Sequence, residues 1–151
     1  MEITILGNQT LLQLPNTAFL ASNTIPVEMV LKCYDWAAKM RDEKRCVISG
    51  FSSKLEKDIW DFLISGCQPI ILVLARDMFR RIPSELQPLL DNGRLLIVST
   101  TTSSRQSKAT AFARNRYICE HADHILFVGA DEHSSLYPLR QHFAFKEITN
   151  I

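Results

Sequence analysis

Short apolar runs alternate with amphipathic segments along most of the chain. The apolar runs are rich in β-branched residues and occupy residues 18–21, 46–48, 70–74, 95–98 and 125–128. Strands that are apolar on both faces need cover on both faces, so this pattern predicts a parallel sheet between two layers of helices. We therefore expect an α/β fold with a three-layer, Rossmann-like, doubly wound and mainly parallel sheet, in one domain spanning residues 1–151.

The segments between these runs repeat apolar residues at helical spacing. The expected helices cover residues 27–41, 55–63, 84–93 and a last segment that ends near residue 121. Gly66 is expected to cap the second helix, and Pro88 favours a kink in the third helix or a later start. Residues 3–6 and 143–148 are short or alternating, and we expect them at the edges of the sheet.

Composition limits the class of protein. Of the 151 residues, 46% are hydrophobic and 22% are charged, which suits one globular domain with a full core. The opening residues lack a basic n-region, and no apolar run approaches the roughly 20 residues that a membrane helix needs. A cytoplasmic protein with no membrane partner is therefore expected. The four cysteines have no Cys-x-x-Cys spacing, so we expect all of them to be buried, reduced thiols.

The loops that follow the expected strands are polar and partly basic. Ligands of doubly wound sheets bind beyond the carboxyl ends of the strands, where the strand order reverses. The residues near these ends that we predict to bind phosphate or nucleic acid are Ser22, Ser49, Gly50, Ser52, Lys54, Arg76, Arg105, Lys108, Arg114, Asn115 and Arg116. Because the formal net charge is only +1, any attraction for nucleic acid must come from this local patch.

The most informative segment is residues 112–116 (FARNR), which lies within residues 99–119, where every charged residue is positive. Guanidinium groups and the free backbone N–H groups at a helix start both bind phosphate, so we favour a phosphate site here. The competing interpretation is a solvated basic helix face. In that case the arginines would pair with Glu56, Asp58 or Glu120.

Helical geometry separates the two arginines that flank Asn115. Asn115 would share a stripe with Ala111 and Ile118 that faces the sheet, and its two neighbours lie about 100° to either side. We therefore expect Asn115 to be a buried structural residue and the arginines to diverge. A small ligand would then meet only one arginine, whereas an extended nucleic acid strand could meet both.

A second basic cluster consists of Arg76, Arg80 and Arg81 around Phe79. An arginine beside an aromatic ring is suited to nucleic acid, because the arginine can contact a phosphate while the ring stacks on a base. The alternative interpretation is an ordinary surface loop that binds no ligand. Phe51 is a further stacking candidate, for which packing in the core is the favoured interpretation.

Three histidines near residue 119 raise the question of a metal site. The His-x-x-His spacing of His121 and His124 spans a helix end, where the two rings often point apart, so we predict no metal and no cofactor. The sequence contains no Ser-His-Asp arrangement typical of a catalytic triad, no paired carboxylates and no P-loop. We therefore expect no enzyme activity. If the protein were a hydrolase, Glu56 and Glu132 would be its candidate catalytic carboxylates.

Several motifs follow one another in an order that resembles a known family. They are residues 49–56 (SGFSSKLE), Gly66 ahead of an apolar strand, Ile82-Pro83, residues 92–99 (NGRLLIVS) and residues 112–116 (FARNR). This order resembles the Rossmann-like core of the DNA-processing protein A (DprA/Smf) family, in the superfamily that it shares with the LOG phosphoribohydrolases. The resemblance covers residues 18–139, and Arg-Asn-Arg after a strand and serine is its most specific part.

The resemblance implies a stand-alone, divergent member that binds the phosphates of single-stranded DNA in a basic pocket. It implies a role in DNA uptake or recombination, and it allows a homodimer and a recombinase as partners. The alternatives are a sensor for a small nucleotide and, less favoured, a nucleotide phosphoribohydrolase. The Gly-Gly-x-Gly-Thr turn of the phosphoribohydrolases is missing at residues 129–133.

The chain also departs from the family pattern. The family's glycine-serine-arginine after the first core strand appears as Ala21-Ser22-Asn23. The second glycine and the aspartate of its next loop appear as Lys54 and Glu56. Loss of a glycine narrows a phosphate cradle, and Lys54 is expected to restore part of the attraction through its charge.

Overall fold

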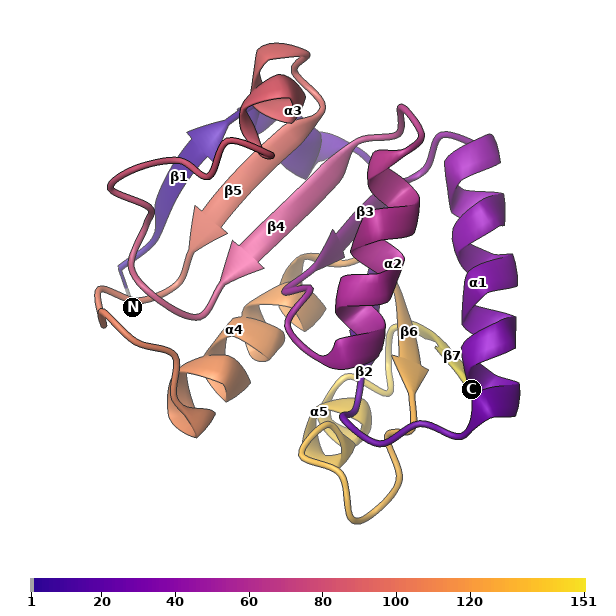
Figure 1. The fold of residues 1–151 in the computed structure, drawn as a ribbon. Helices are drawn as coiled ribbons and strands as arrows, with labels where there is room; N and C mark the ends of the chain where they lie inside the picture. The colour runs from indigo at the N-terminus through magenta and orange to yellow at the C-terminus, as the bar shows by residue number, and fades with distance from the viewer. Residues whose placement is uncertain (1) are drawn as a thin grey trace.

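The computed structural model describes residues 2–151 and contains one seven-stranded sheet (Figure 1). The strands are β1 (Thr4–Gly7), β2 (Asn16–Ala21), β3 (Cys46–Ser49), β4 (Ile70–Leu74), β5 (Leu95–Ser99), β6 (His124–Val128) and β7 (Glu147–Asn150). Their order across the sheet is β1-β5-β4-β3-β2-β6-β7, and all neighbours are parallel except β1, which is antiparallel to β5. The predicted mainly parallel, Rossmann-like α/β fold is confirmed.

Helices cover both faces of the sheet (Figure 1). They are the 3-10 helix η1 (Gln9–Gln13), α1 (Val27–Asp42), α2 (Lys54–Ile64), α3 (Gln87–Asp91), α4 (Lys108–His121) and α5 (Tyr137–His142). Residues of α1, α2 and α3 pack on one face, and residues of η1, α4 and α5 pack on the other. Within residues 2–151, none of the helices has both the length and the apolar character to cross a membrane.

The helix starts follow from local sequence. Ser53 caps α2 and Ser107 caps α4, and each serine forms a capping box with the third residue of its helix. Proline lacks the N–H group that a helix interior needs, and α3 accordingly starts at Gln87, so that Pro88 falls in its first turn. This confirms the later start of the third helix.

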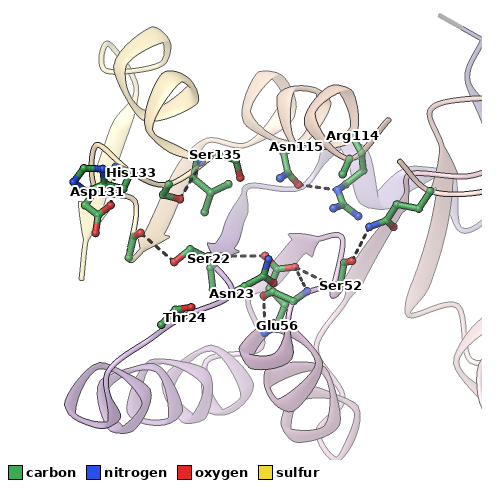
Figure 2. A pocket seen from close by; sticks show the side chains of 17 residues that line it. Ser22, Asn23, Thr24, Ser52, Glu56, Arg114, Asn115, Asp131, His133 and Ser135 are labelled. Atoms are coloured by element: carbon green, nitrogen blue, oxygen red, sulfur yellow. Dashed lines mark hydrogen bonds between the residues drawn. The ribbon is translucent and has the colours of Figure 1, made fainter. Parts of the chain in front are cut away.

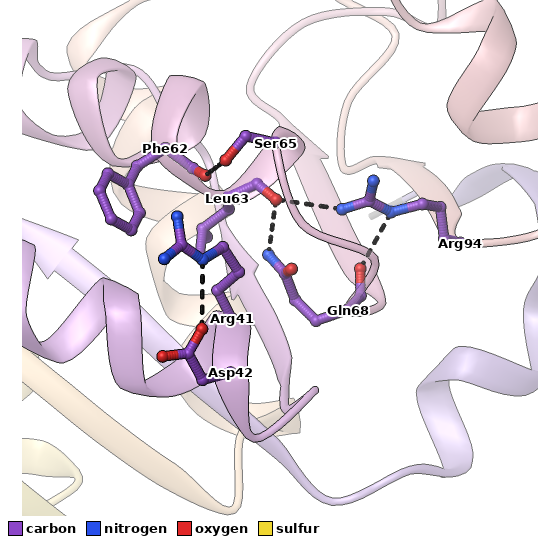
Figure 3. A network of polar contacts seen from close by, with 7 residues as sticks. All are labelled: Arg41, Asp42, Phe62, Leu63, Ser65, Gln68 and Arg94. Atoms are coloured by element: carbon purple, nitrogen blue, oxygen red, sulfur yellow. Dashed lines mark hydrogen bonds and ion pairs between the residues drawn. The ribbon is translucent and has the colours of Figure 1, made fainter.

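The end of α2 differs from the prediction (Figure 3). The cap is Ser65, and Gly66 does not have the positive φ of a glycine cap. A Cβ on Gly66 would collide with the side chain of Arg41, so glycine is needed here for close packing. The free carbonyls of the helix end bind Arg94 instead, which donates to Leu63 O at 3.1 Å and to Gly66 O.

Both predicted edge strands exist, at β1 and β7. The C-terminal one is shorter than expected, because Phe143 ends α5 and buries its ring in the core instead of starting a strand. The sequence pattern missed α5, since a helix of six residues that begins at a proline is too short to show a period.

The cysteines differ in accessibility. Cys33, Cys46 and Cys119 are buried, and burial raises their pKa values to about 11, about 12 and about 12. Cys67 is exposed in the α2–β4 loop, so the expectation that all four thiols are buried is wrong at this residue.

Thiol alkylation tests this distinction, because the thiolate is the reactive form and three of the thiols are both buried and hard to ionise. We expect iodoacetamide to modify Cys67 alone in the native protein and all four cysteines in urea, as read by mass spectrometry. Modification of Cys33 or Cys119 under native conditions would contradict the packing described here.

Candidate functional site

The strand order reverses at β2, in the middle of the sheet. The chain leaves β2 through α1 to β3 on one side, and it returns from β5 through α4 to β6 on the other side. Such a reversal leaves a crevice beyond the carboxyl ends of the strands, because the two connections run on opposite faces. A cavity of about 540 Å³ lies there, at the edge of the sheet that the sequence predicts.

Four segments line this cavity (Figure 2). They are residues 21–24 after β2, the β3–α2 turn with the start of α2, residues 106–115 around the first turns of α4, and the loop after β6. Hydroxyl and amide groups predominate in the lining, with Arg114 on one wall and Asp131 and His133 on the opposite wall. The cavity therefore suits a polar ligand.

Arg114 is the buried cation of the cavity, with only 4% of its surface exposed. Its Nε donates to Asn115 Oδ1 at 2.7 Å, and no other hydrogen bond or ion pair within residues 2–151 engages its guanidinium. Burial lowers the pKa of Arg114, whereas the negative charge of Glu56 raises it, and an arginine stays protonated in either case. A charged fork with unused donors thus faces the cavity.

Gly50 makes room for this arginine. A Cβ added at Gly50 would collide with the Arg114 guanidinium, which lies directly over the Gly50 backbone. The φ angle of Gly50 is not positive, so an alanine could adopt the same backbone conformation. Glycine is therefore required here for the approach of Arg114 and not for the turn.

Gly50→Ala is expected to push the guanidinium out of position and to weaken anion binding about tenfold, since one charge-assisted hydrogen bond contributes about 1.5 kcal/mol. Anion affinity, measured by titration, checks this. The matched control is Gly66→Ala, which clashes with Arg41 beyond the amino end of β4 and should lower stability without changing affinity. Equal anion affinities for the Gly50→Ala variant and the wild type would contradict the role of Gly50 in making room for the Arg114 guanidinium.

Glu56 holds the floor of the cavity together. Its carboxylate is 3% exposed and accepts three backbone N–H bonds, from Ala21 at 3.0 Å, from Ser52 at 2.9 Å and from Ser53 at 3.2 Å. These bonds join the end of β2 to the start of α2 (Figure 2). Of the two carboxylates that the sequence offers a hydrolase, this one is thus engaged by backbone donors.

The two arginines of α4 diverge as predicted. Arg114 faces the cavity, whereas Arg116 is exposed and its Nε lies 3.2 Å from Glu120 Oε1. The alternative of a solvated basic face is therefore correct for Arg116. The burial of Asn115 was wrongly predicted, because Asn115 is half-buried in the cavity wall and Arg114 is the buried residue. The room above Gly50 admits the guanidinium of Arg114, and a helical-stripe argument within α4 does not take account of a residue in another loop.

The structure brings together only part of the predicted set. Ser22, Ser52, Arg114 and Asn115 line the cavity. Ser49 is buried behind it, where its Oγ accepts a hydrogen bond from Phe51 N at 3.1 Å. The exposed cations outside the lining are Lys54, Arg76, Arg105, Lys108 and Arg116. Lys54 is exposed outside the lining, and the expectation that its charge offsets the missing glycine stays a prediction.

Other lining residues were not in the predicted set. Asn23 and Asp131 are the second and third residues after the ends of β2 and β6, so the carboxyl-end rule applied to every polar residue would have included them. Gln106 gave no signal in sequence, yet its Nε2 donates to Ser52 Oγ at 3.1 Å and joins two loops over the cavity. Phe51 is not free to stack on a base, because it is 7% exposed and packs edge-on against Trp60.

The histidine-rich region does not gather into a ligand set. His121 packs on the ring of Tyr117 with centroids 4.1 Å apart, and the His133 ring is exposed beside Glu132. In the part of the chain that the structure describes, no three His, Cys, Asp or Glu side chains lie close enough together to hold a metal ion.

Comparison with known proteins places the fold. No protein-family model and no curated protein sequence matches the chain. Its structure is similar to that of DNA processing protein A from Streptococcus pneumoniae, with a TM-score of 0.76 and 18% identity. It is also similar to that of DNA processing protein A from Helicobacter pylori, described for its single-stranded DNA binding mode, with a TM-score of 0.75 and 17% identity.

These likenesses include nearly all of this chain but not all of the other proteins. Each covers 98% of this chain, with 54% of the S. pneumoniae protein and 70% of the H. pylori protein. The chain therefore spans about half the length of the first of them. The fold is a DprA-like Rossmann fold, as the motif order indicates.

Proposed function

We propose that this chain binds single-stranded DNA through its phosphates in the cavity at the carboxyl edge of the sheet. The observation that carries the proposal is the buried Arg114 guanidinium, whose terminal nitrogens have no partner within residues 2–151. Burying a charge is unfavourable unless a partner compensates it, and an anion that enters the cavity could accept hydrogen bonds from these nitrogens. A phosphate group accepts two parallel bonds from such a fork.

The surroundings of Arg114 offer further polar groups to a phosphate, which has several acceptor oxygens. Ser22 and Ser52 place hydroxyl groups in the same cavity, and Asn115 adds a side-chain amide. None of these groups distinguishes one base from another, so binding should be independent of sequence. The fold neighbour from H. pylori, described for single-stranded DNA binding, adds an independent reason to test DNA first.

A small nucleotide is the second candidate, and one observation favours it. Only one of the two α4 arginines faces the cavity, whose volume of about 540 Å³ lies in the range of small-molecule sites. A mononucleotide would place its phosphate on Arg114 and its sugar toward the opposite wall. The cavity would then act as a sensor site on the same scaffold.

A titration of a fluorescent single-stranded oligonucleotide tests the proposal. We expect binding at low salt. The logarithm of the binding constant should fall linearly with the logarithm of the salt concentration, because the protein releases counterions from the phosphates that it binds. Mononucleotides are then added as competitors. Displacement by a mononucleotide at micromolar concentration, together with stabilisation against heat, would favour the sensor. Absence of oligonucleotide binding at low salt would overturn the DNA proposal.

The wider role belongs to the same proposal. We propose that the chain takes part in DNA uptake or recombination in the cytoplasm, as a binding protein without catalytic activity, and that a homodimer or a recombinase is its protein partner. Release of free base from nucleoside monophosphates would instead identify a phosphoribohydrolase. Incubation of the purified protein with the four common ribonucleoside monophosphates, followed by chromatography of the bases, decides this point.

A further inference from the structure

We infer that the β4–α3 loop is a second phosphate contact, for a single strand that leaves the cavity and continues along the carboxyl edge of the sheet. This inference rests on the proposed function. The contact is formed by Arg76, Arg80 and Arg81, which we call the loop arginines. It gives the site a direction, from β2 toward β4, and a length greater than one nucleotide.

Hydrogen bonds make the carboxyl-edge loops one continuous surface. Gln106 joins the β5–α4 loop to Ser52 in the cavity. The same β5–α4 loop joins the β4–α3 loop, because Asp77 N donates to Ser103 O at 2.7 Å. The hydroxyl of Ser99, at the end of β5, donates to Arg76 O at 2.6 Å. These bonds hold the start of the β4–α3 loop, with Arg76, in a fixed relation to the cavity, and Arg80 and Arg81 follow in the same loop.

The reach between the two contacts is short. β4 is separated from β2 by β3 alone, and neighbouring strands lie roughly 4.8 Å apart, so their ends are about 10 Å from one another. Arg105 lies in the β5–α4 loop and Lys108 is the first residue of α4, and both are exposed. A strand of a few nucleotides that passes from Arg114 to Arg76 would cross loops that carry these cations among uncharged polar residues such as Ser52 and Gln106.

The charges of the loop arginines are not neutralised within residues 2–151. None of the three forms an ion pair, and the Nε of Arg76 donates only to the carbonyl of Asp77. The Asp77 carboxylate accepts instead from Met78 N at 2.9 Å. Arginines elsewhere on the surface do have acidic partners, as in the pairs Arg45–Glu43 and Arg116–Glu120. Unpaired arginines beside the cavity are available for phosphate.

Phe79 anchors the loop and does not stack on a base. Its ring is half-buried and packs against the core on the α1, α2 and α3 side of the sheet. The guanidinium of Arg76 lies 5.5 Å from the ring centroid, so the accessible ring face is already covered. The contact is therefore to phosphate, with no preference for particular bases.

The test compares two oligothymidylates across a salt series. The short one is the dinucleotide TpT, whose single phosphate can occupy only one contact, and the long one has about sixteen nucleotides. The loop variant is Arg80→Ala/Arg81→Ala, and its matched control is Lys39→Ala/Arg45→Ala, which removes the same charge from the opposite edge of the sheet. For the long oligonucleotide, we expect the plot of log K against the logarithm of the salt concentration to be less steep by about 1.4 in the loop variant, because each of two lost phosphate contacts contributes about 0.7. The affinity of the loop variant for this oligonucleotide should fall about tenfold. Its affinity for the short oligonucleotide should not change.

The outcomes separate this inference from the proposed function. An unchanged slope in the loop variant overturns the second contact, and the cavity site stands if Arg114→Met still loses both oligonucleotides. An equal loss in the control variant also overturns it, because the effect would then be one of total charge. If the wild-type protein binds neither oligonucleotide at low salt, the proposed function itself fails. The loop variant and its control should keep the melting temperature of the wild type, since all four changed side chains are exposed.

Discussion

Replacing Arg114 by methionine is expected to weaken the binding of a single-stranded oligonucleotide about 10- to 100-fold. The variant removes charge-assisted hydrogen bonds in a desolvated site, each contributing about 1.5–3 kcal/mol. Methionine keeps most of the apolar stem of Arg114 and removes the guanidinium that lies over Gly50. Arg114→Lys should give an intermediate affinity, because it keeps the charge and loses the fork.

The same change is expected to leave stability equal or to raise it. Folding buries the Arg114 charge with a single hydrogen bond to Asn115, and the lowered pKa has the same cause, which is loss of water around the guanidinium. Replacing a buried, poorly paired charge by an apolar group is often neutral or stabilising. Urea denaturation measures the stability, and fluorescence anisotropy measures the binding.

Arg116→Met is the matched control for Arg114→Met. Arg116 is one residue away on the same helix, carries the same charge, and pairs with Glu120 on the surface. We expect less than a twofold change in affinity for a short oligonucleotide. Equal losses in the two variants would contradict the account of the cavity, and parallel losses of binding and stability in Arg114→Met would show that the arginine serves the scaffold.

Replacing Glu56 by alanine is expected to lower the free energy of unfolding by about 3 kcal/mol or more. Three backbone N–H groups, of Ala21, Ser52 and Ser53, would lose their acceptor in a buried place, and each unsatisfied donor is unfavourable by about 1–3 kcal/mol. The reciprocal capping box at the start of α2 would be lost as well. Urea denaturation followed by circular dichroism measures this effect.

Glu56→Ala also tests how the cavity is shaped. The variant separates the end of β2 from the start of α2, so oligonucleotide binding should fall even where the protein remains folded. Glu120→Ala is the control, because it removes a carboxylate with only a surface ion pair and should change stability by less than about 1 kcal/mol. A small effect of Glu56→Ala on stability would show that water can replace the carboxylate as acceptor of the three backbone hydrogen bonds. Glu56 would then not be needed to join the end of β2 to the start of α2.

The strands were predictable because each central strand is buried on both faces and is therefore apolar throughout. The runs at β4 and β6 each lie within one residue of the observed strand bounds. The position of the cavity was predictable for a topological reason, since the reversal of strand order places the crevice beyond β2 and β6. Neither inference depends on the conformation of any single side chain.

The direction of Arg114 was not predictable in the same way. A helical stripe places Asn115 toward the sheet and ranks an arginine as a surface residue, whereas the structure buries the arginine. The cause is the missing side chain of Gly50, in another loop, which leaves space that no pattern within α4 reveals. The far wall, with Asp131 and His133, was left out of the predicted set, although the carboxyl-end rule covers Asp131, which lies just beyond β6.

Nuclear magnetic resonance of the arginine side chains tests the central claim most directly. In protein labelled with nitrogen-15, the Nε–H signal of Arg114 should be visible, because this group is buried and bonded to Asn115. On titration with a short oligothymidylate at low salt, we predict that this signal shifts strongly while that of Arg116 stays in place. A shift of Arg116 with an unmoved Arg114 would contradict phosphate binding in the cavity.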